Sequence, residues 1–391
     1  MNLMHRLLDK PRTLTARRWL FQIHLWVGIF VGLYAIAIGV SGSVLVFREE
    51  IVDARTSAHH HVPAPPDATR ASPDQWLAAV RQATGHKGPL SMRLPVSSTD
   101  AVEVTYYARN SGHAVFVNPY TSQIMAHVVT ASPVLRWLDT LHSNFFLGRT
   151  GRLLNGIGAL LLLALAITGI FIWWPGRRLW RRRLTIDFKG RWKRINWDLH
   201  HAIGFWGLAG FTILCITGAW FTWPQFYRQT VARYFPVTAQ ALSKVESQPD
   251  APRASLAQLI RAADDAFPGK PVWNIFLPGP PTDMVRINKL GEGNPPHRTA
   301  TTILLNPYSA KVIRVESYAN KTTGDKILGW IGPLHTGNFA GLGVKIFYSI
   351  LGLTMPTLFI TGFIMWWQRV VRPRWRTTKP APEKETVTAV A

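Results

Sequence analysis

The chain has 391 residues and a formal charge of +23, because 44 Lys and Arg face 21 Asp and Glu. The basic residues cluster beside apolar runs, where membrane topology and anionic lipid headgroups explain them, so we expect no nucleic-acid partner. The lone cysteine, Cys215, excludes a disulfide framework, and the lack of a Cys-x-x-Cys-His sequence excludes covalently attached haem.

Four long runs lack Asp, Glu, Lys and Arg: Trp19–Phe47, Leu153–Pro175, Leu199–Tyr227 and Ile346–Gln368. About twenty apolar residues suffice to cross the hydrocarbon core of a bilayer, so the sequence predicts four membrane spans. The first run follows Arg17 and Arg18 but is too long for a signal-peptide core. We expect it to remain as a signal anchor.

Orientation follows from the basic segment between the second and third runs, which belongs on the cytoplasmic side. Both termini are then cytoplasmic, and both long polar segments are periplasmic in a bacterial inner membrane. We therefore divide the chain into an N-terminus with the first span (1–47), a periplasmic domain with an interfacial segment (48–150), the second span (151–175), a basic loop (176–196), the third span (197–227), a second periplasmic domain with an interfacial segment (228–337), the fourth span (338–368) and a tail (369–391).

The two polar segments repeat each other. Residues 114–125 and 302–313 both read as strand, turn and strand around Asn-Pro-Tyr. A helical stretch lies upstream of each hairpin, at Pro73–Thr84 and Ser255–Ala266. Short alternating runs, at 101–107 and 283–288, lie between each helical stretch and its hairpin. We expect two small α+β domains, each a helix packed on an antiparallel sheet.

The spans repeat as well, which indicates an internal twofold repeat of the fold. His24 stands before Gly28 and Ser41-Gly42 at the spacings at which His200 stands before Gly204 and Thr217-Gly218. Further on, the residues that keep one register are His142, Arg152, Thr168-Gly169 and Trp173-Trp174 in the first half, and His335, Lys345, Thr361-Gly362 and Trp366-Trp367 in the second.

Histidines close to the hydrocarbon are costly, so they are functional candidates. If the halves are related by an axis along the membrane normal, His24 and His200 face each other near the cytoplasm, and His142 and His335 face each other near the periplasm. Facing neutral imidazoles suit axial ligation of haem iron, so we expect two non-covalent haems b. The glycines let backbones or a flat macrocycle approach.

Three further residues have open roles. Arg152 and Lys345 either pair with haem propionates or are ordinary cations at the membrane edge. His201 points about 100° away from His200 around the helix, so only one of the two meets a given iron. The repeat favours His200 as the ligand. For His201 four roles stay open: a hydrogen bond to Asp198, ligation of a further haem, proton uptake, or packing.

The histidines outside the spans read differently. The run His59-His60-His61 is a candidate for metal capture or an exposed linker. The remaining five have no repeat partner and are expected to be ordinary surface residues: His5, His86, His113, His127 and His297.

Taken together, these elements resemble the PepSY-associated transmembrane family. Its pattern is a helix beginning near a histidine, a PepSY-like domain ending in an Asn-Pro-Tyr hairpin, and Leu-His leading into a helix that ends in Thr-Gly and paired tryptophans. The glycine usual in the hairpin turn is replaced by Ser122 and Ala310. Some members are similar to inner-membrane, haem-containing reductases of the ferrioxamine B reductase type, which release iron from ferric siderophores.

This resemblance implies an oxidoreductase that passes electrons outward to a ferric siderophore in the periplasm. No nucleotide or flavin motif is present, so the donor is a membrane quinol or a separate protein. Two other classes stay open. A non-redox zinc or iron transporter or sensor would use Asp198, His200, His201 and His24 as ligands, and a structural partner of a membrane complex would bind no cofactor.

Overall fold

The computed structural model describes residues 14–64, 68–108, 111–238, 244–246, 248, 251–292 and 299–373. Its chain forms two compact units, each built from both halves of the sequence. The helical unit takes its described residues from 1–46, 138–224 and 331–391, and the sheet unit takes them from 47–137 and 225–330. The tail beyond residue 373, His5 and His297 lie outside the described residues.

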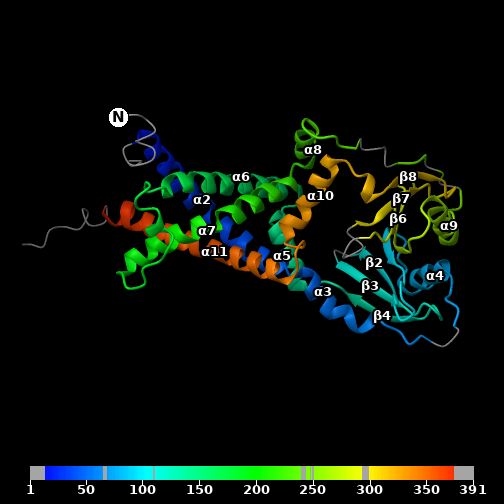
Figure 1. The fold of residues 1–391 in the computed structure, drawn as a ribbon. Helices are drawn as coiled ribbons and strands as arrows, with labels where there is room; N and C mark the ends of the chain where they lie inside the picture. Colours follow the sequence, from blue (N-terminus) through cyan, green and yellow to red (C-terminus); the bar gives the residue numbers. More distant parts are fainter. Residues whose placement is uncertain are drawn as a thin grey trace, which may run out of the picture. The chain divides into compact units, whose positions relative to one another are not determined.

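Four long helices form the helical unit: α2 (Thr15–Leu45), α6 (Gly148–Trp173), α7 (Trp192–Trp220) and α11 (Leu342–Trp366). They lie alongside one another in Figure 1, and each of α2 and α7 contacts both α6 and α11. All four are long and apolar enough to cross a membrane. The prediction of four spans is therefore confirmed.

The third span differs from its expected bounds. Helix α7 begins at Trp192, inside the expected basic loop, and ends at Trp220 rather than near residue 227. A separate helix, α8 (Pro224–Ala232), follows it. Proline disfavours helical backbone in the residue before it, so an uncharged run that continues past Trp220 does not continue as one helix.

Short helices lead into the second and fourth spans, as expected. They are α5 (Pro133–Asn144) and α10 (Thr323–Thr336), which carry His142 and His335 near their ends. Left-handed residues at the junctions turn the chain into α6 and α11; they are Phe145, Phe146 and Gly148 after α5 and Gly337 and Gly341 after α10.

The sheet unit contains one antiparallel sheet of eight strands, in the order β4-β3-β2-β1-β5-β6-β7-β8. We expected two separate small sheets, and this is wrong: β1 pairs with β5 and joins them. The strands are β1 (Leu90–Arg93), β2 (Val102–Ala108), β3 (Ser111–Val117), β4 (Ile124–Val129), β5 (Val272–Leu277), β6 (Val285–Lys289), β7 (Thr301–Leu305) and β8 (Val312–Glu316).

One helix from each half packs on this sheet, at the expected positions. Helix α4 (Pro73–Thr84) has Ser72 as its N-cap and α9 (Leu256–Ala266) has Ser255, and each serine forms a capping box with a glutamine three residues later. Trp76 and Val80 of α4 and Leu259 of α9 are buried in one core with inward-facing strand residues. The two halves of the sheet unit therefore share this hydrophobic core.

The two hairpin turns have the same unusual backbone. Ser122 has φ 59° and Ala310 has φ 56°, in the left-handed region that favours glycine. In each turn the side-chain oxygen of an asparagine, Asn118 or Asn306, accepts hydrogen bonds from the two backbone N–H groups that follow the proline. These side-chain bonds hold the turns although neither has glycine at the strained position.

Short helical turns and connecting helices complete the described chain. Helix α3 (Arg48–Thr56) follows α2 and is succeeded by a 3-10 turn, η2 (Ser57–His59). Further short turns are η3 (Arg181–Arg183) in the basic loop, η5 (Tyr318–Asn320) before α10 and η6 (Trp367–Val371), which extends α11 with one π turn.

Candidate functional site

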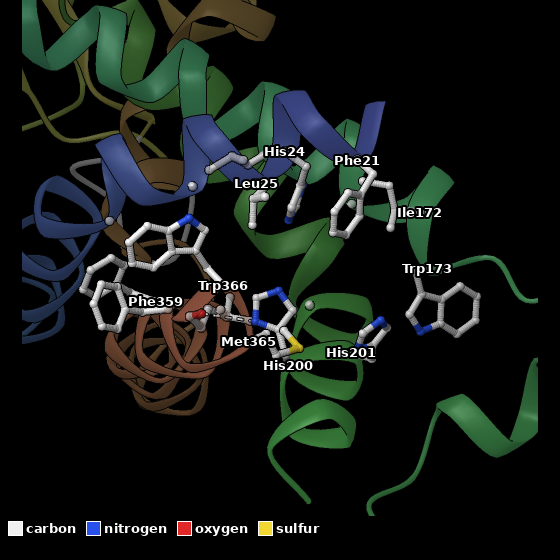
Figure 2. Close-up of a pocket in the computed structure, with 18 of the residues that line it drawn as sticks. Phe21, His24, Leu25, Ile172, Trp173, His200, His201, Phe359, Met365 and Trp366 are labelled. Atoms are coloured by element: carbon white, nitrogen blue, oxygen red, sulfur yellow. Dashed lines mark hydrogen bonds between the residues drawn. The ribbon is translucent and has the colours of Figure 1, made fainter. Parts of the chain in front are cut away.

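Two pairs of histidines face each other inside the helical unit. The ring centres of His24 on α2 and His200 on α7 are 6.4 Å apart. Those of His142 on α5 and His335 on α10 are 6.2 Å apart. Figure 2 shows His24 and His200 pointing into the same space from their two helices. The structure thus brings together the residues that the repeat placed in register, in the pairs expected from it.

Each of these histidines has a hydroxyl beside its Nδ1 atom. The distances from Nδ1 to the hydroxyl oxygen are 3.0 Å for His24 with Thr168, 3.0 Å for His142 with Ser41, 3.0 Å for His200 with Thr361 and 3.1 Å for His335 with Thr217. The sequence had marked these Ser/Thr-Gly pairs by their spacing, but we had given a role only to the glycine.

The direction of these hydrogen bonds follows from a second contact. Every one of the four hydroxyls lies 2.6–2.7 Å from the carbonyl oxygen four residues earlier in its helix, to which it donates. A hydroxyl has one hydrogen, so it accepts from the imidazole and Nδ1 carries the proton. The Nε2 atom of each ring is then the unprotonated one, free to bind a metal as a neutral ligand.

The glycine after each hydroxyl leaves room for the imidazole. A Cβ atom on that glycine would lie within 2.9–3.4 Å of the ring's Cε1 atom at all four positions, namely Gly42, Gly169, Gly218 and Gly362. Our reading of these glycines as space for a neighbouring backbone or a macrocycle is therefore replaced by a contact with the histidine. Gly28 and Gly204 are different, because the nearest atom is 3.9 Å away at the first and none lies within 4 Å at the second.

A cavity of about 1030 Å³ surrounds the first pair. Its size is at the upper end of the range for small-molecule and cofactor sites. Both Gly28 and Gly204 line it, together with apolar residues of all four long helices. Cationic side chains also line it, and they are Arg17, Arg18, Arg183, Lys193 and Arg369.

Two tryptophans in this cavity carry unused hydrogen-bond donors. The Nε1 atoms of Trp173 on α6 and Trp366 on α11 are buried and have no hydrogen-bond partner. Both residues line the cavity, and they occupy equivalent places in the two halves. A buried N–H without a partner is costly, so this pair points to an acceptor that occupies the cavity.

His201 lies in the same cavity but has other contacts. Its ring stacks on Trp197, with centres 3.8 Å apart, and its Nδ1 donates to the Trp197 carbonyl at 2.7 Å. The expected alternative of a hydrogen bond from His201 to Asp198 is not seen: Nδ1 of His201 is used by the Trp197 carbonyl, and Oδ2 of Asp198 accepts from Nε of Arg194 at 2.8 Å. Within the described ranges, no group of three or more His, Cys, Asp or Glu is placed to hold a metal ion. Asp198, His200, His201 and His24, the ligands expected for a transporter, do not form such a group.

The two expected propionate partners differ in environment. Arg152 is exposed, whereas Lys345 is buried, with 4% of its surface accessible. Near the linker, His59 and His60 pack against Phe116, with ring centres 5.6 and 5.3 Å from it. Sequence reasoning missed a cluster in the sheet unit, where three histidines gather around Tyr106; they are His86, His113 and His127.

Comparison with known proteins relates the chain to one family and to one curated relative. A family profile described as the PepSY-associated TM region matches residues 21–369, which is most of the chain. A protein of Pseudomonas aeruginosa, the uncharacterized protein PA4219, is 25% identical over 258 residues. That match covers 61% of this chain and 64% of the relative, so the chain spans less than two thirds of the relative's length.

Proposed function

Because the chain belongs to the PepSY-associated TM family, we propose that it is a two-haem electron-transfer protein of the bacterial inner membrane. One haem b would lie between His24 and His200, and a second between His142 and His335. The single observation that carries this proposal is the fourfold contact of an imidazole Nδ1 with a helix hydroxyl, which leaves every Nε2 free.

The spacing of the rings supports ligation by both members of a pair. Imidazole nitrogens bind first-row metals at about 2.0–2.1 Å, so two rings on opposite sides of one metal have centres about 6 Å apart. The observed separations, 6.4 and 6.2 Å, agree with this arrangement. His200 also has its ring facing His24, whereas His201 is held against Trp197, so we propose His200 as the ligand.

The cavity around the first pair suits a haem by its donors as well as its size. Haem propionates are carboxylates, and buried N–H groups and arginines are strong partners for them. Trp173 and Trp366 would donate from Nε1, and Arg183, which also lines the cavity, supplies positive charge. For the second haem, Arg152 and the buried Lys345 remain the proposed propionate partners.

A haem with two imidazole ligands supplies one-electron transfer without a change of ligand. The chain's own contribution is to hold each imidazole neutral and correctly turned, through the hydroxyl, and to place one pair toward each end of the bundle. We propose a membrane quinol or a separate protein as the donor. The proposed acceptor is a ferric siderophore, by resemblance to the ferric-siderophore reductases, since reduction to Fe(II) weakens binding by hard oxygen ligands.

A visible spectrum of the purified protein before and after dithionite tests the proposal. We expect sharp α and Soret bands of low-spin haem b after reduction and two haems per chain by pyridine haemochrome analysis. Added ferric siderophore should then reoxidise the reduced protein. A protein without porphyrin that contains stoichiometric zinc would support the transporter class, and one with no cofactor would support the structural class; either result rejects the haem proposal.

A further inference from the structure

A second set of metal-binding side chains lies in the sheet unit, apart from the histidine pairs. Tyr106 on β2 stands opposite His113 on β3, and His127 on β4 stands opposite the next inward-facing residue of β3, Val115. Antiparallel register places these three side chains on one face of the sheet. The end of α4 contributes His86 to the same place.

The tyrosine ring stacks on two imidazoles. The ring centre of His86 is 4.2 Å from that of Tyr106, with planes 23° apart, and His113 lies on the tyrosine at 5.0 Å with planes 7° apart. Stacked aromatic rings have few orientations open to them. The stacking therefore restricts the directions in which the hydroxyl of Tyr106 and the Nδ1 atom of His113 can point.

Two polar atoms lie close to one nitrogen of His127. Its Nε2 atom lies 3.1 Å from Nδ1 of His113 and 3.1 Å from the hydroxyl of Tyr106. A neutral imidazole nitrogen either accepts through one lone pair or donates one hydrogen. The contact thus brings more polar atoms together than a single linear hydrogen bond uses.

The distance between Nδ1 of His113 and Nε2 of His127 fits the binding of both nitrogens to one metal ion. Two imidazole nitrogens bound at about 2.0 Å to one metal lie about 2.8 Å apart at a right angle and about 3.3 Å apart at a tetrahedral angle. The observed distance of 3.1 Å lies between these values. His127 is exposed, so water or an incoming chelate can fill the remaining positions.

We propose that Tyr106, His113 and His127 form a binding site for Cu²⁺. Nitrogen and oxygen ligands in an open arrangement suit this ion, which also binds most tightly among the divalent first-row metals. The two imidazoles carry the affinity, and the tyrosine hydroxyl is a third, weaker donor. All donors belong to the sheet unit, so the site does not depend on the haem proposal.

Titration of the full-length protein in detergent with Cu²⁺ tests the site. We expect the wild type to bind one more equivalent of Cu²⁺ tightly than His127→Ala does. Replacement of either His113 or His127 by alanine should weaken binding at this site by a factor of about ten or more. The Cu²⁺ electron paramagnetic resonance spectrum should lose nitrogen hyperfine structure in the same variants. Zn²⁺ should bind the same site more weakly.

The matched control is His86→Phe, which preserves stacking on Tyr106 but removes an imidazole that has no close contact with His127. It should bind Cu²⁺ as the wild type does. Copper at any other place, such as His59-His60-His61, contributes equally to all variants and cancels. Equal binding by wild type and both alanine variants overturns the proposal, and so does a site that takes Zn²⁺ but not Cu²⁺. Circular dichroism and thermal unfolding, which should be unchanged, confirm that the variants fold.

Discussion

His200 donates from Nδ1 to the hydroxyl of Thr361 at 3.0 Å, and Thr361 donates in turn to the carbonyl of Thr357 at 2.6 Å. The imidazole is thereby turned with Nε2 toward His24, and its tautomer is set by a backbone carbonyl one helical turn away. Three further histidines have the same relay, so it is a shared feature of the proposed ligands rather than a detail of one.

Loss of the Thr361 hydroxyl should shift the midpoint potential of the proposed haem at His200 while the haem stays bound. In Thr361→Val the shape of the side chain is preserved, but Nδ1 of His200 loses one acceptor, and metal affinity falls about 10- to 100-fold when such partners are lost. We expect a shifted midpoint potential, measured by redox titration, for the inner haem, which is the one proposed between His24 and His200. The outer haem, proposed between His142 and His335, should keep its potential. The control is Thr354→Val in the same helix, because the Thr354 hydroxyl donates to the Leu351 carbonyl at 2.6 Å. Equal potentials in wild type and Thr361→Val contradict the proposed role.

A methyl group at the glycine after the hydroxyl should displace the histidine. The Cβ atom of Gly42→Ala would lie 2.9 Å from Cε1 of His142, too close for either to stay in place. Overpacking of this kind costs about 1–3 kcal/mol, so occupancy of the outer haem should fall while the inner haem remains. Gly343→Ala, in α11, has no atom within 4 Å of its added Cβ and should retain both haems. Haem content from absorbance per chain decides the matter.

The order of the two haems along the electron path follows from their separate ligands. His142→Ala or His335→Ala should disturb the outer haem and stop ferric-chelate reduction while the inner haem is still reduced by quinol. His24→Ala or His200→Ala should remove the inner haem, leaving an outer haem that only a small external reductant can reduce. Reduced-minus-oxidised spectra of the four variants measure this. Loss of the same haem in both His24→Ala and His142→Ala shows that the pairing is wrong.

The two strained hairpin turns offer a gain in stability. Ser122 and Ala310 have positive φ, which costs a residue other than glycine about 1–2 kcal/mol. We expect Ser122→Gly and Ala310→Gly each to raise the unfolding free energy of the sheet unit by about 1 kcal/mol, with additive effects because the turns are distant in the sheet. Thr121→Gly is the control: its φ is not positive, so it should be neutral or destabilising. Thermal unfolding followed by circular dichroism provides the measurement.

Acid should weaken the start of α10 through Asp325. Partial burial acts to raise the pKa of this carboxyl, but hydrogen bonds from Thr238 and Thr322 and the charge of Arg228 outweigh it, so the pKa is lowered in the folded protein. The ionised form therefore stabilises the fold above the unfolded pKa of about 3.9, and this stability is lost as the pH falls through the lower folded pKa.

The expected result for Asp325→Asn is a loss of about 1–3 kcal/mol at neutral pH and a smaller decline in stability below about pH 4 than in the wild type. Unfolding temperatures between pH 3 and 7 report this difference. Glu292→Gln removes a carboxylate that is 86% exposed and should change neither quantity. The idea is wrong if the two variants have the same acid dependence.

Local patterns in the sequence were enough to place the spans, the helices of the sheet unit and both hairpins. Ser72 and Ser255 mark helix starts because the capping box is a local interaction. The pairing of β1 with β5 was missed because it joins residues far apart in the chain, and a four-residue strand has little periodicity of its own. The expected end of the third span lay seven residues past the end of α7, because hydropathy does not register the break before Pro224.

The histidine pairs were predictable because both members stand in a repeated register. The hydroxyls beside Nδ1 lay in the same register, yet their role requires knowledge of which side chain faces which. No repeat marks His113 and His127, and only the register of β2, β3 and β4 reveals that they meet at Tyr106. Contacts of this kind are absent from any single stretch of sequence.

The seam between β1 and β5 bears on how such a chain can be divided. Met92 pairs with Ile275, and each lies twenty residues after its helix-capping serine, Ser72 or Ser255. The seam therefore pairs equivalent positions of the two halves. Antiparallel contact between equivalent positions is the geometry of an isologous homodimer interface. A chain with only one half would leave β1 or β5 as an edge strand with unpaired N–H and C=O groups. Pairing with the same strand of a second copy would satisfy these groups, so such a chain should self-associate.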